Sequence, residues 1–265
     1  MGFPKSVRLG RTELSVGPLA VASGYGIDTA SLREAFDRGV NYWYHGSMRR
    51  PGMTRAVREL VAEGKRDQLV LLLQSYSRWP WLLENSLERG LRQLRIDHAD
   101  VLLLGWFNSM PSALILDRVE KLRARGLFRY LAISSHERTM FPVFAADPRF
   151  DILHVRYNAA HTGAERDVFP AMPKEGRPGI VAYTATRWGQ LCDPGKMPEG
   201  EPPLRGRDCY RFVLSNPDFD VCMTGPKSAE HMREALAALD EGPLAPEEDT
   251  RFRRIGAHLR GGDGV

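Results

Sequence analysis

The sequence has little cysteine and no long apolar run. Its 265 residues include three cysteines, Cys192, Cys209 and Cys222, which are too few and too scattered for a disulfide framework or a CxxC metal site. This pattern favours a reducing compartment, and we expect a cytoplasmic protein. No stretch approaches the roughly 18 apolar residues of a membrane span, and the segment 1–6 lacks the apolar core of a signal peptide.

The chain also lacks a basic run interleaved with stacking aromatic residues, so we expect no nucleic-acid partner. Lys and Arg number 37 against 33 Asp and Glu, which gives a net charge of +4 and an isoelectric point near 9.0. The basic residues are spread along the chain, so they permit an anionic ligand without pointing to one. We expect a small-molecule substrate or ligand and no membrane partner, and the sequence leaves the oligomeric state open.

Apolar runs typical of buried parallel strands alternate with helical stripes along the chain. After a short hairpin across Gly10, the expected strands are 18–23, 40–44, 68–73, 101–104, 129–134, 151–155, 179–183 and 218–223. Eight strand–helix units imply a parallel sheet that closes on itself. We therefore predict an α/β fold: one (β/α)8 TIM-barrel domain over residues 1–265, with the N-terminal β-hairpin capping the barrel bottom.

Three helix starts can be predicted from capping residues. Thr54 is expected to cap a helix over 55–63, and Ser228 is expected to cap one over 229–239. Pro246 suits the first position of a last helix, because the N–H group that proline lacks would be unpaired there.

The end of the predicted strand 40–44 carries candidate catalytic groups, because chemistry sits at the carboxyl ends of barrel strands. Tyr44 and His45 could form an acid/base pair, since His titrates near neutrality. Alternatively, Tyr44 only fills space. Tyr44 and His45 are adjacent, and adjacent strand residues point to opposite faces, which argues against their acting as a pair. Arg49 and Arg50 could bind an anionic substrate or could lie in a solvated loop.

Motifs spread over the whole chain resemble the aldo-keto reductase superfamily. They lie, in the family's order, at 9–14, 39–42, 86–94, 97–102, 156–158, 179–183, 224–228 and 234–236. The resemblance implies the same barrel, with NADP(H) bound in an extended pose over the carboxyl ends of the strands. It also implies reversible reduction of aldehydes and ketones.

The family's reaction uses four residues at the barrel mouth, and the aligned positions all differ here. In the family, a Tyr donates a proton, a Lys and an Asp lower its pKa, and a His orients the carbonyl. The Asp aligns with Tyr44, the Tyr with Arg49, the Lys with Gln74 and the His with Gly105. Arg does not release a proton at neutral pH, and Gln has no charge with which to acidify a phenol of pKa about 10. We expect the usual proton relay not to operate unaltered, although hydride transfer from a bound nicotinamide stays possible.

The resemblance implies a nicotinamide site that is retained in part. Ser134 stands where the family has a Ser on the carboxamide, and the usual Asn neighbour is Ser135. His154 replaces a Gln that also contacts the carboxamide. Tyr183 matches the aromatic residue that stacks under the nicotinamide ring.

The resemblance also implies a phosphate and adenine end of the cofactor site. The loop 184–190 matches the one that holds the pyrophosphate, and 225–228 opens a helix whose N-terminus suits the adenosine phosphate. An Asn that usually follows the adenine-side Glu is Ala235 here. The residues expected on this side are Thr184, Gly189, Lys227, Ser228, Arg233 and Glu234.

Further candidates at the mouth are Gln74, Tyr76 and Trp106 as pocket lining or packing, and His136 as a group that supplies or orients a proton. The histidines contain no HxH or HxxxH pair, so we expect no metal site.

Three functions follow from these residues. The first is an oxidoreductase that binds NADP(H) and uses a rearranged acid group. The second is a non-catalytic cofactor- or ligand-binding barrel. The third is a non-redox barrel enzyme acting on a metabolite held by Arg49 and the mouth histidines.

Overall fold

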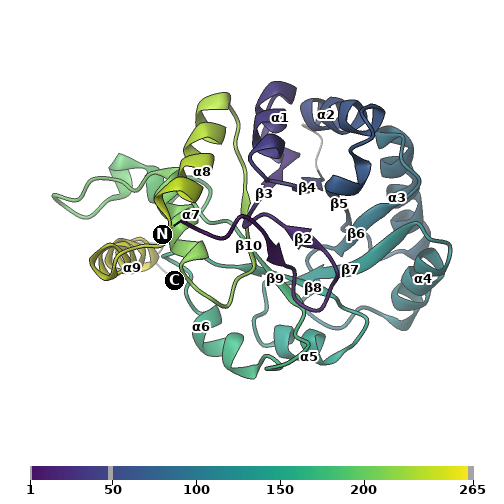
Figure 1. The fold of residues 1–265 in the computed structure, drawn as a ribbon. Helices are drawn as coiled ribbons and strands as arrows, with labels where there is room; N and C mark the ends of the chain where they lie inside the picture. Colours follow the sequence, from purple (N-terminus) through teal and green to yellow (C-terminus); the bar gives the residue numbers. More distant parts are fainter. Residues whose placement is uncertain (1, 47–49, 262–265) are drawn as a thin grey trace.

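Eight parallel strands form a closed barrel in the computed structural model, which describes residues 2–46 and 50–261 (Figure 1). Each strand pairs with the next one in the sequence, and the last closes the barrel against the first. The strands are β3 (Leu19–Ala22), β4 (Tyr42–His45), β5 (Val70–Ser75), β6 (Ala99–Leu104), β7 (Phe128–Ser134), β8 (Ile152–Arg156), β9 (Gly179–Tyr183) and β10 (Val221–Thr224). The predicted (β/α)8 architecture is confirmed.

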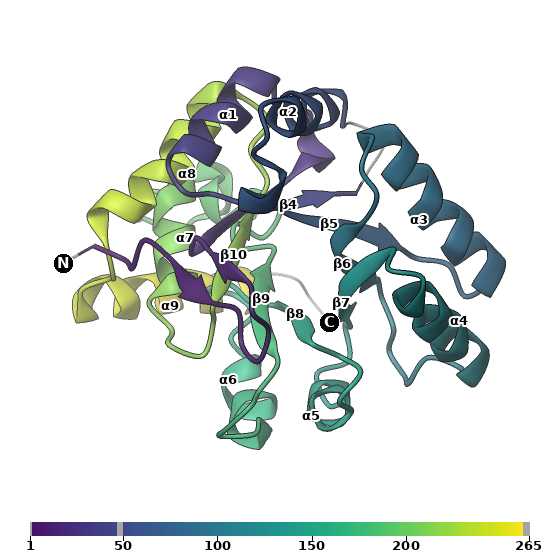
Figure 2. The ribbon, with the colours of Figure 1, turned by 45° about the vertical axis from the view of Figure 1, so that its right-hand side comes forward.

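Helices follow the strands and surround the barrel, as the two ribbon views show (Figures 1 and 2). Within the described residues, none of them is both long and apolar enough to cross a membrane. The helices are α1 (Thr29–Asp37), α2 (Pro51–Ala62), α3 (Pro80–Leu94), α4 (Ala113–Ala124), α5 (Met140–Ala146), α6 (Ala164–Asp167), α7 (Gly206–Leu214), α8 (Ala229–Glu241) and α9 (Pro246–Gly261).

Helix α2 begins earlier than predicted. Pro51 occupies its first turn and Arg50 is its N-terminal flanking residue, with no side-chain cap. Thr54 therefore lies inside the helix, where its hydroxyl donates to the carbonyl of Arg50 at 2.9 Å, and its predicted role as a cap was wrong. Proline is favoured at a helix start, and here it outweighed the capping residue. The predicted cap of α8 is confirmed, because the Ser228 side chain accepts the N–H of His231.

The N-terminal hairpin, β1 (Val7–Arg8) and β2 (Ser15–Val16), covers the bottom of the barrel as predicted. Gly10 at its turn has a φ of 53° and lies against the first residue of β9, Gly179. A Cβ at Gly10 would overlap the backbone there. The Arg11 N–H also donates to the carbonyl of Arg177 at 2.9 Å. Only a residue without a side chain permits this close approach in this conformation.

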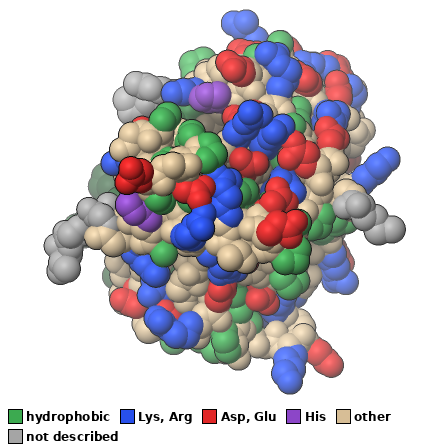
Figure 3. Space-filling view, turned by 90° about the vertical axis from the view of Figure 1, so that its left-hand side faces the viewer, with side chains coloured by type: hydrophobic (Ala, Val, Ile, Leu, Met, Phe, Trp, Pro, Cys, Tyr) green, Lys and Arg blue, Asp and Glu red, His purple; other side chains and the backbone are tan. Residues whose placement is uncertain are grey.

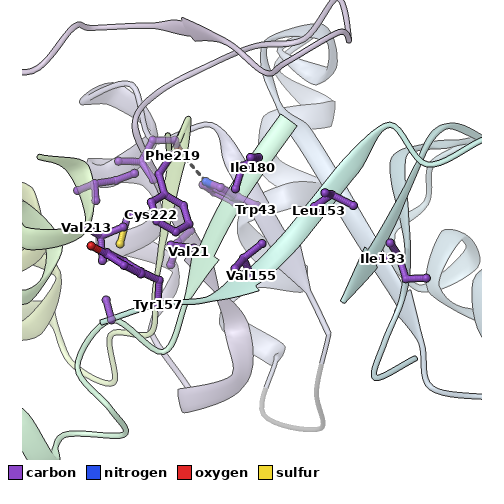
Figure 4. Close-up of a cluster of buried hydrophobic side chains, with 14 of the residues drawn as sticks. Val21, Trp43, Ile133, Leu153, Val155, Tyr157, Ile180, Val213, Phe219 and Cys222 are labelled. Atoms are coloured by element: carbon purple, nitrogen blue, oxygen red, sulfur yellow. Dashed lines mark hydrogen bonds between the residues drawn. The ribbon is translucent and has the colours of Figure 1, made fainter. Parts of the chain in front are cut away.

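Strand side chains alternate between the barrel interior and the surrounding helices, as the period of a strand requires. On β4, Tyr42 belongs to the interior cluster, whereas Trp43 belongs to the outer cluster beneath the helices. Figure 4 shows Trp43 with Val21, Leu153 and Ile180 among the outer residues. This alternation decides which side chains reach the mouth.

The long segment after β9 is attached to the last helix by ion pairs. It contains two short 3-10 turns, Gln190–Cys192 and Pro194–Lys196, in a region predicted to be irregular. The Glu201 carboxylate pairs with Arg251 at 2.9 Å and also with Arg254 of α9. On the face shown in Figure 3, basic and acidic side chains are interleaved.

Candidate functional site

A cavity of about 1000 Å³ opens at the carboxyl ends of the barrel strands. Tyr44, Tyr76 and Trp106 line one end, Tyr183 lines the middle, and Lys227 lines the far end next to α8. Sites for small ligands usually have about 300–1000 Å³, so this cavity has room for a large one. Its position is the one at which barrels of this class place their ligands.

Tyr44 and Gln74, on neighbouring strands β4 and β5, are hydrogen-bonded to each other. The Tyr44 hydroxyl donates to Oε1 of Gln74, and Nε2 of Gln74 donates to the carbonyl of Gly46 at 3.3 Å. Burial, and then the nearby Tyr76, raise the pKa of the Tyr44 phenol far above its usual value. These two positions therefore hold an uncharged pair at neutral pH.

Gly105, directly after β6, leaves room for the ring of Tyr76. A Cβ on residue 105 would overlap Cδ1 and Cε1 of that ring, so no side chain fits there while Tyr76 keeps its place. The Tyr76 hydroxyl lies 3.5 Å from the Tyr44 hydroxyl. A phenol from the end of β5 thus occupies the space next to Gly105.

His45 does not share the cavity with Tyr44. It points outward from β4, and its Nε2 lies 2.9 Å from Oγ1 of Thr54 in α2. Burial, followed by the charge of Arg50, lowers its pKa to about 3. The structure thus separates the proposed Tyr44–His45 pair, because adjacent strand residues face opposite sides. Arg49, the other candidate in this region, lies outside the described residues.

His136 follows β7 and lies beside the cavity rather than in its lining. It is exposed and packs edge-on against Trp106, with 5.0 Å between the ring centroids. Partial burial and then the charge of Arg156 lower its pKa. A role for His136 therefore depends on contact through Trp106 or on a ligand that reaches past it.

Three of the four residues expected around the nicotinamide, Ser134, His154 and Tyr183, line the middle of the cavity, and Ser135 does not. The Ser134 Oγ accepts the Trp106 N–H at 3.0 Å and keeps its own hydrogen for a ligand. Ser135 is buried away from the cavity, and its hydroxyl donates to Oδ1 of Asn108 at 3.1 Å. Burial raises the pKa of Tyr183 to about 12, and its hydroxyl donates to the Ser135 carbonyl at 3.3 Å.

His154 lines the same part of the cavity from inside the barrel. Its Nε2 lies 3.1 Å from the hydroxyl of Tyr42, so one ring nitrogen is paired and the other is left for a ligand. Burial lowers the pKa of His154 to about 3, which keeps the imidazole neutral at pH 7.

This burial predicts a pH-dependent loss of stability. The pKa of His154 is about 3 when folded and about 6.5 when unfolded, so the unfolded chain binds the extra proton between these values. The free energy of unfolding should therefore fall as the pH drops below about 6.5, by up to about 1.4 kcal/mol per pH unit for this residue. We expect His154→Gln to reduce the loss between about pH 7 and pH 5 by about 2 kcal/mol in urea titrations.

The matched control is His258→Gln, because His258 is exposed on α9. That variant should lose stability with falling pH as the parent does. If His154→Gln followed the parent curve as well, the buried imidazole would not be the source of the effect.

The loop after β9 lines the cavity with backbone in the left-handed region, which is strained for every residue except glycine. Thr184, Trp188 and Gly189 have φ values of 62°, 54° and 87°. The Thr184 carbonyl is held by Nδ2 of Asn158 at 2.9 Å. The N–H groups of Thr186 and Trp188 make no hydrogen bond to any other residue of the described chain. Backbone N–H groups presented by such turns suit an anion.

Lys227 and Glu234, two of the residues predicted for the adenosine side, line the far end of the cavity. Oε1 of Glu234 accepts the N–H of Gly206 at 3.1 Å, which joins α8 to the end of the long loop. Ser228 does not line the cavity, because its side chain caps α8. Arg233 is exposed and also lies outside the lining.

Other lining residues were not predicted from the sequence. Tyr25 lies just after β3 and packs so closely on Gly225 that a Cβ there would lie 2.5 Å from its ring. Its place after a strand end is a signal that could have found it. His231 and Cys192 also line the cavity, and no motif pointed to them. Within residues 2–46 and 50–261, no cluster of three His, Cys, Asp or Glu could hold a metal ion.

Comparison with known families agrees with this architecture. The model of the Aldo/keto reductase family matches residues 25–199, which is well over half of the chain. The chain belongs to the aldo/keto reductase family. No curated protein matches it closely enough at the sequence level to be counted as a relative.

Solved structures of aldo/keto reductases share the fold. The holo form of aldo-keto reductase AKR11C1 from Bacillus halodurans superposes with a TM-score of 0.76 at 18% identity, covering 94% of this chain and 95% of that one. The apo form of the same enzyme gives a TM-score of 0.74 at 17% identity with the same coverage. At this identity the likeness establishes the fold alone.

Proposed function

We propose that this aldo/keto reductase family member is an oxidoreductase that binds NADP(H) in the cavity and passes a hydride to a small-molecule acceptor. The observation that carries the proposal is one continuous cavity, running from the strand ends of β4–β6 to the start of α8. A cytoplasmic location, expected from the few cysteines, is part of the same proposal.

The residues present fit a nicotinamide dinucleotide. At the nicotinamide end, the Ser134 hydroxyl and the free ring nitrogen of His154 can bind a carboxamide, and the Tyr183 ring offers a flat surface. At the phosphate end, the unpaired N–H groups of Thr186 and Trp188 and the Lys227 ammonium favour anionic groups. When bound, the cofactor supplies the hydride chemistry.

The chain's own residues would orient the acceptor, but Tyr44 and Gln74 would not supply an activated proton to it. Tyr44 and Gln74 form an uncharged pair, and the Tyr44 proton is held by Gln74. We therefore infer that the acceptor's proton does not come from a phenol activated by an ammonium group, as in the usual family mechanism. In the alignment, Tyr44, Arg49, Gln74 and Gly105 occupy the positions of the family's Asp, Tyr, Lys and His.

The first test is cofactor binding by calorimetry. We expect NADPH to bind the parent chain, and we expect Lys227→Ala to weaken NADPH binding about tenfold. Hydrogen bonds to charged groups contribute about 1.5–3 kcal/mol, and the exposure of Lys227 places its contact with a phosphate at the lower end of that range. Replacing Tyr183 by Leu should weaken NADPH and NADH alike, because both carry the nicotinamide ring. The matched control is Lys174→Ala on an exposed turn, which should bind as the parent does. Absence of binding at millimolar NADPH would contradict the proposal.

A non-catalytic cofactor- or ligand-binding barrel is the second candidate. The neutral Tyr44–Gln74 pair favours it, because these residues offer no acid or base of suitable pKa. It predicts NADPH binding without turnover of any carbonyl or quinone acceptor. For a non-redox enzyme, activity would persist without cofactor and would be lost in Arg49→Ala or His45→Ala.

A further inference from the structure

Two aromatic side chains line the end of the cavity farthest from α8, and a third packs edge-on against one of them beside the cavity. We call Tyr76, Trp106 and His136 the aromatic wall; they follow the neighbouring strands β5, β6 and β7. The ring centroids of Tyr76 and Trp106 lie 6.0 Å apart, and those of Trp106 and His136 lie 5.0 Å apart. Trp106 is 59% exposed and Tyr76 is 56% exposed, although both line the cavity.

Trp106 is held in this exposed position at a conformational cost. Its φ of 61° is a rare value for a bulky residue. The backbone N–H of Trp106 donates to Oγ of Ser134 at 3.0 Å, and the backbone carbonyl of Trp106 accepts from the guanidinium of Arg78. The same guanidinium stacks 3.6 Å from the ring of Phe107. Strained residues that the surroundings hold in place are found mainly at binding and catalytic sites.

The Tyr76 hydroxyl is available to a ligand beside this indole. Its nearest hydrogen-bonding group in the described chain is the Tyr44 hydroxyl at 3.5 Å, which is a long and weak contact. The Tyr44 proton already goes to Gln74, so the Tyr76 hydrogen can turn toward a carbonyl in the cavity. No charged side chain of the described residues is hydrogen-bonded to either hydroxyl.

We propose that the aromatic wall binds a flat, conjugated dicarbonyl of the quinone class, with its ring against Trp106 and one carbonyl oxygen accepting from Tyr76. A flat ring gains stacking contact with an exposed indole that a saturated ring does not. The wall stands at the end of the cavity where the acceptor would meet the nicotinamide, so this inference rests on the proposed function for its redox part but not for binding.

The chemistry of the product favours a quinone over a simple ketone. Hydride addition to an isolated ketone leaves an alkoxide, which is a much stronger base than a phenolate and requires an activated acid. Hydride addition to a quinone leaves a hydroquinone anion, which is itself a phenolate, so the proton can come from a phenol that no ammonium group activates. One hydride, carrying two electrons, comes from the reduced nicotinamide, which becomes oxidised. The hydroquinone anion then takes one proton from the Tyr76 hydroxyl, and the Tyr76 phenolate regains a proton from water.

The test is calorimetry on the cofactor-free chain with duroquinone, whose ring has no open position for the Cys192 thiol to attack. Its ring-saturated counterpart, the tetramethylcyclohexanedione, carries the same two carbonyls without the flat ring. We expect duroquinone to bind at least tenfold more tightly than the dione. We expect Trp106→Leu to weaken duroquinone binding about five- to tenfold, and Tyr76→Phe about fivefold.

The matched control is Trp79→Leu, because Trp79 is 65% exposed and lies outside the cavity lining. That variant should bind duroquinone as the parent does. Equal binding of duroquinone and the dione, or equal effects of the Trp106 and Trp79 substitutions, would overturn the inference. Duroquinone binding without NADPH binding would instead refute the proposed function and leave the aromatic wall as a ligand site.

Discussion

Restoring the four usual family residues is expected to raise aldehyde reduction at least about a hundredfold over the parent chain, because positioned general acid catalysis contributes about 10²–10⁴-fold. The Tyr44–Gln74 pair would become an ion pair able to lower the pKa of a new phenol. Rates of NADPH oxidation with para-nitrobenzaldehyde would measure the gain. The variant carries Tyr44→Asp, Arg49→Tyr, Gln74→Lys, Gly105→His and Tyr76→Ala.

The fifth substitution is required by the packing at Gly105. Any side chain there overlaps the Tyr76 ring, so His at residue 105 can reach the mouth only when that ring has left. The version that keeps Tyr76 should therefore gain about tenfold less activity than the version with Tyr76→Ala. If the complete variant folds, binds NADPH and still reduces no aldehyde, the alignment of these four positions is wrong.

Gly10→Ala is expected to lower the free energy of unfolding by at least about 3 kcal/mol. The added Cβ would overlap backbone atoms of Pro178 and Gly179, which cannot turn away as a flexible side chain can. The hairpin would have to move off the barrel bottom, and the Arg11 hydrogen bond to Arg177 would be broken. Urea unfolding would measure the loss.

Gly176→Ala separates the clash from the backbone strain. Gly176 has a φ of 61°, close to the 53° of Gly10, but a Cβ at Gly176 would meet nothing within 4 Å. The free energy of unfolding of Gly176→Ala should fall by only about 1–2 kcal/mol, which is the cost of the left-handed conformation for alanine. Similar losses in the two variants would mean that the hairpin does not depend on this close approach.

Most of the fold could be predicted from the sequence because burial sets a clear period. Uninterrupted apolar runs such as the one that became β5 suit strands covered on both faces. Boundaries were less secure: β10 begins at Val221 rather than at residue 218, and α2 begins at Pro51 rather than after Thr54. These ends depend on local competition between capping groups, which periodicity does not record.

The candidate site could be predicted only as far as strand ends. Alternation along β4 implied that Tyr44 and His45 point to opposite faces, but it did not say which of them lines the cavity. The structure places Tyr44 in the cavity and His45 against Thr54. The bond between Tyr44 and Gln74 joins two strands, and the place of Tyr76 over Gly105 depends on a loop conformation. Neither contact could be predicted from the spacing of residues in the sequence, because each joins residues that are distant along the chain.

The closure of β10 on β3 has a consequence for how the protein is made. The Thr224 hydroxyl donates to the carbonyl of Ala20 across 204 positions of the chain, and the cavity takes lining from both ends of that span. A ribosome must therefore release the chain at least as far as Thr224 before the cavity can be complete. Until then, β3 and the newest strand present open edges, which can pair with other nascent chains.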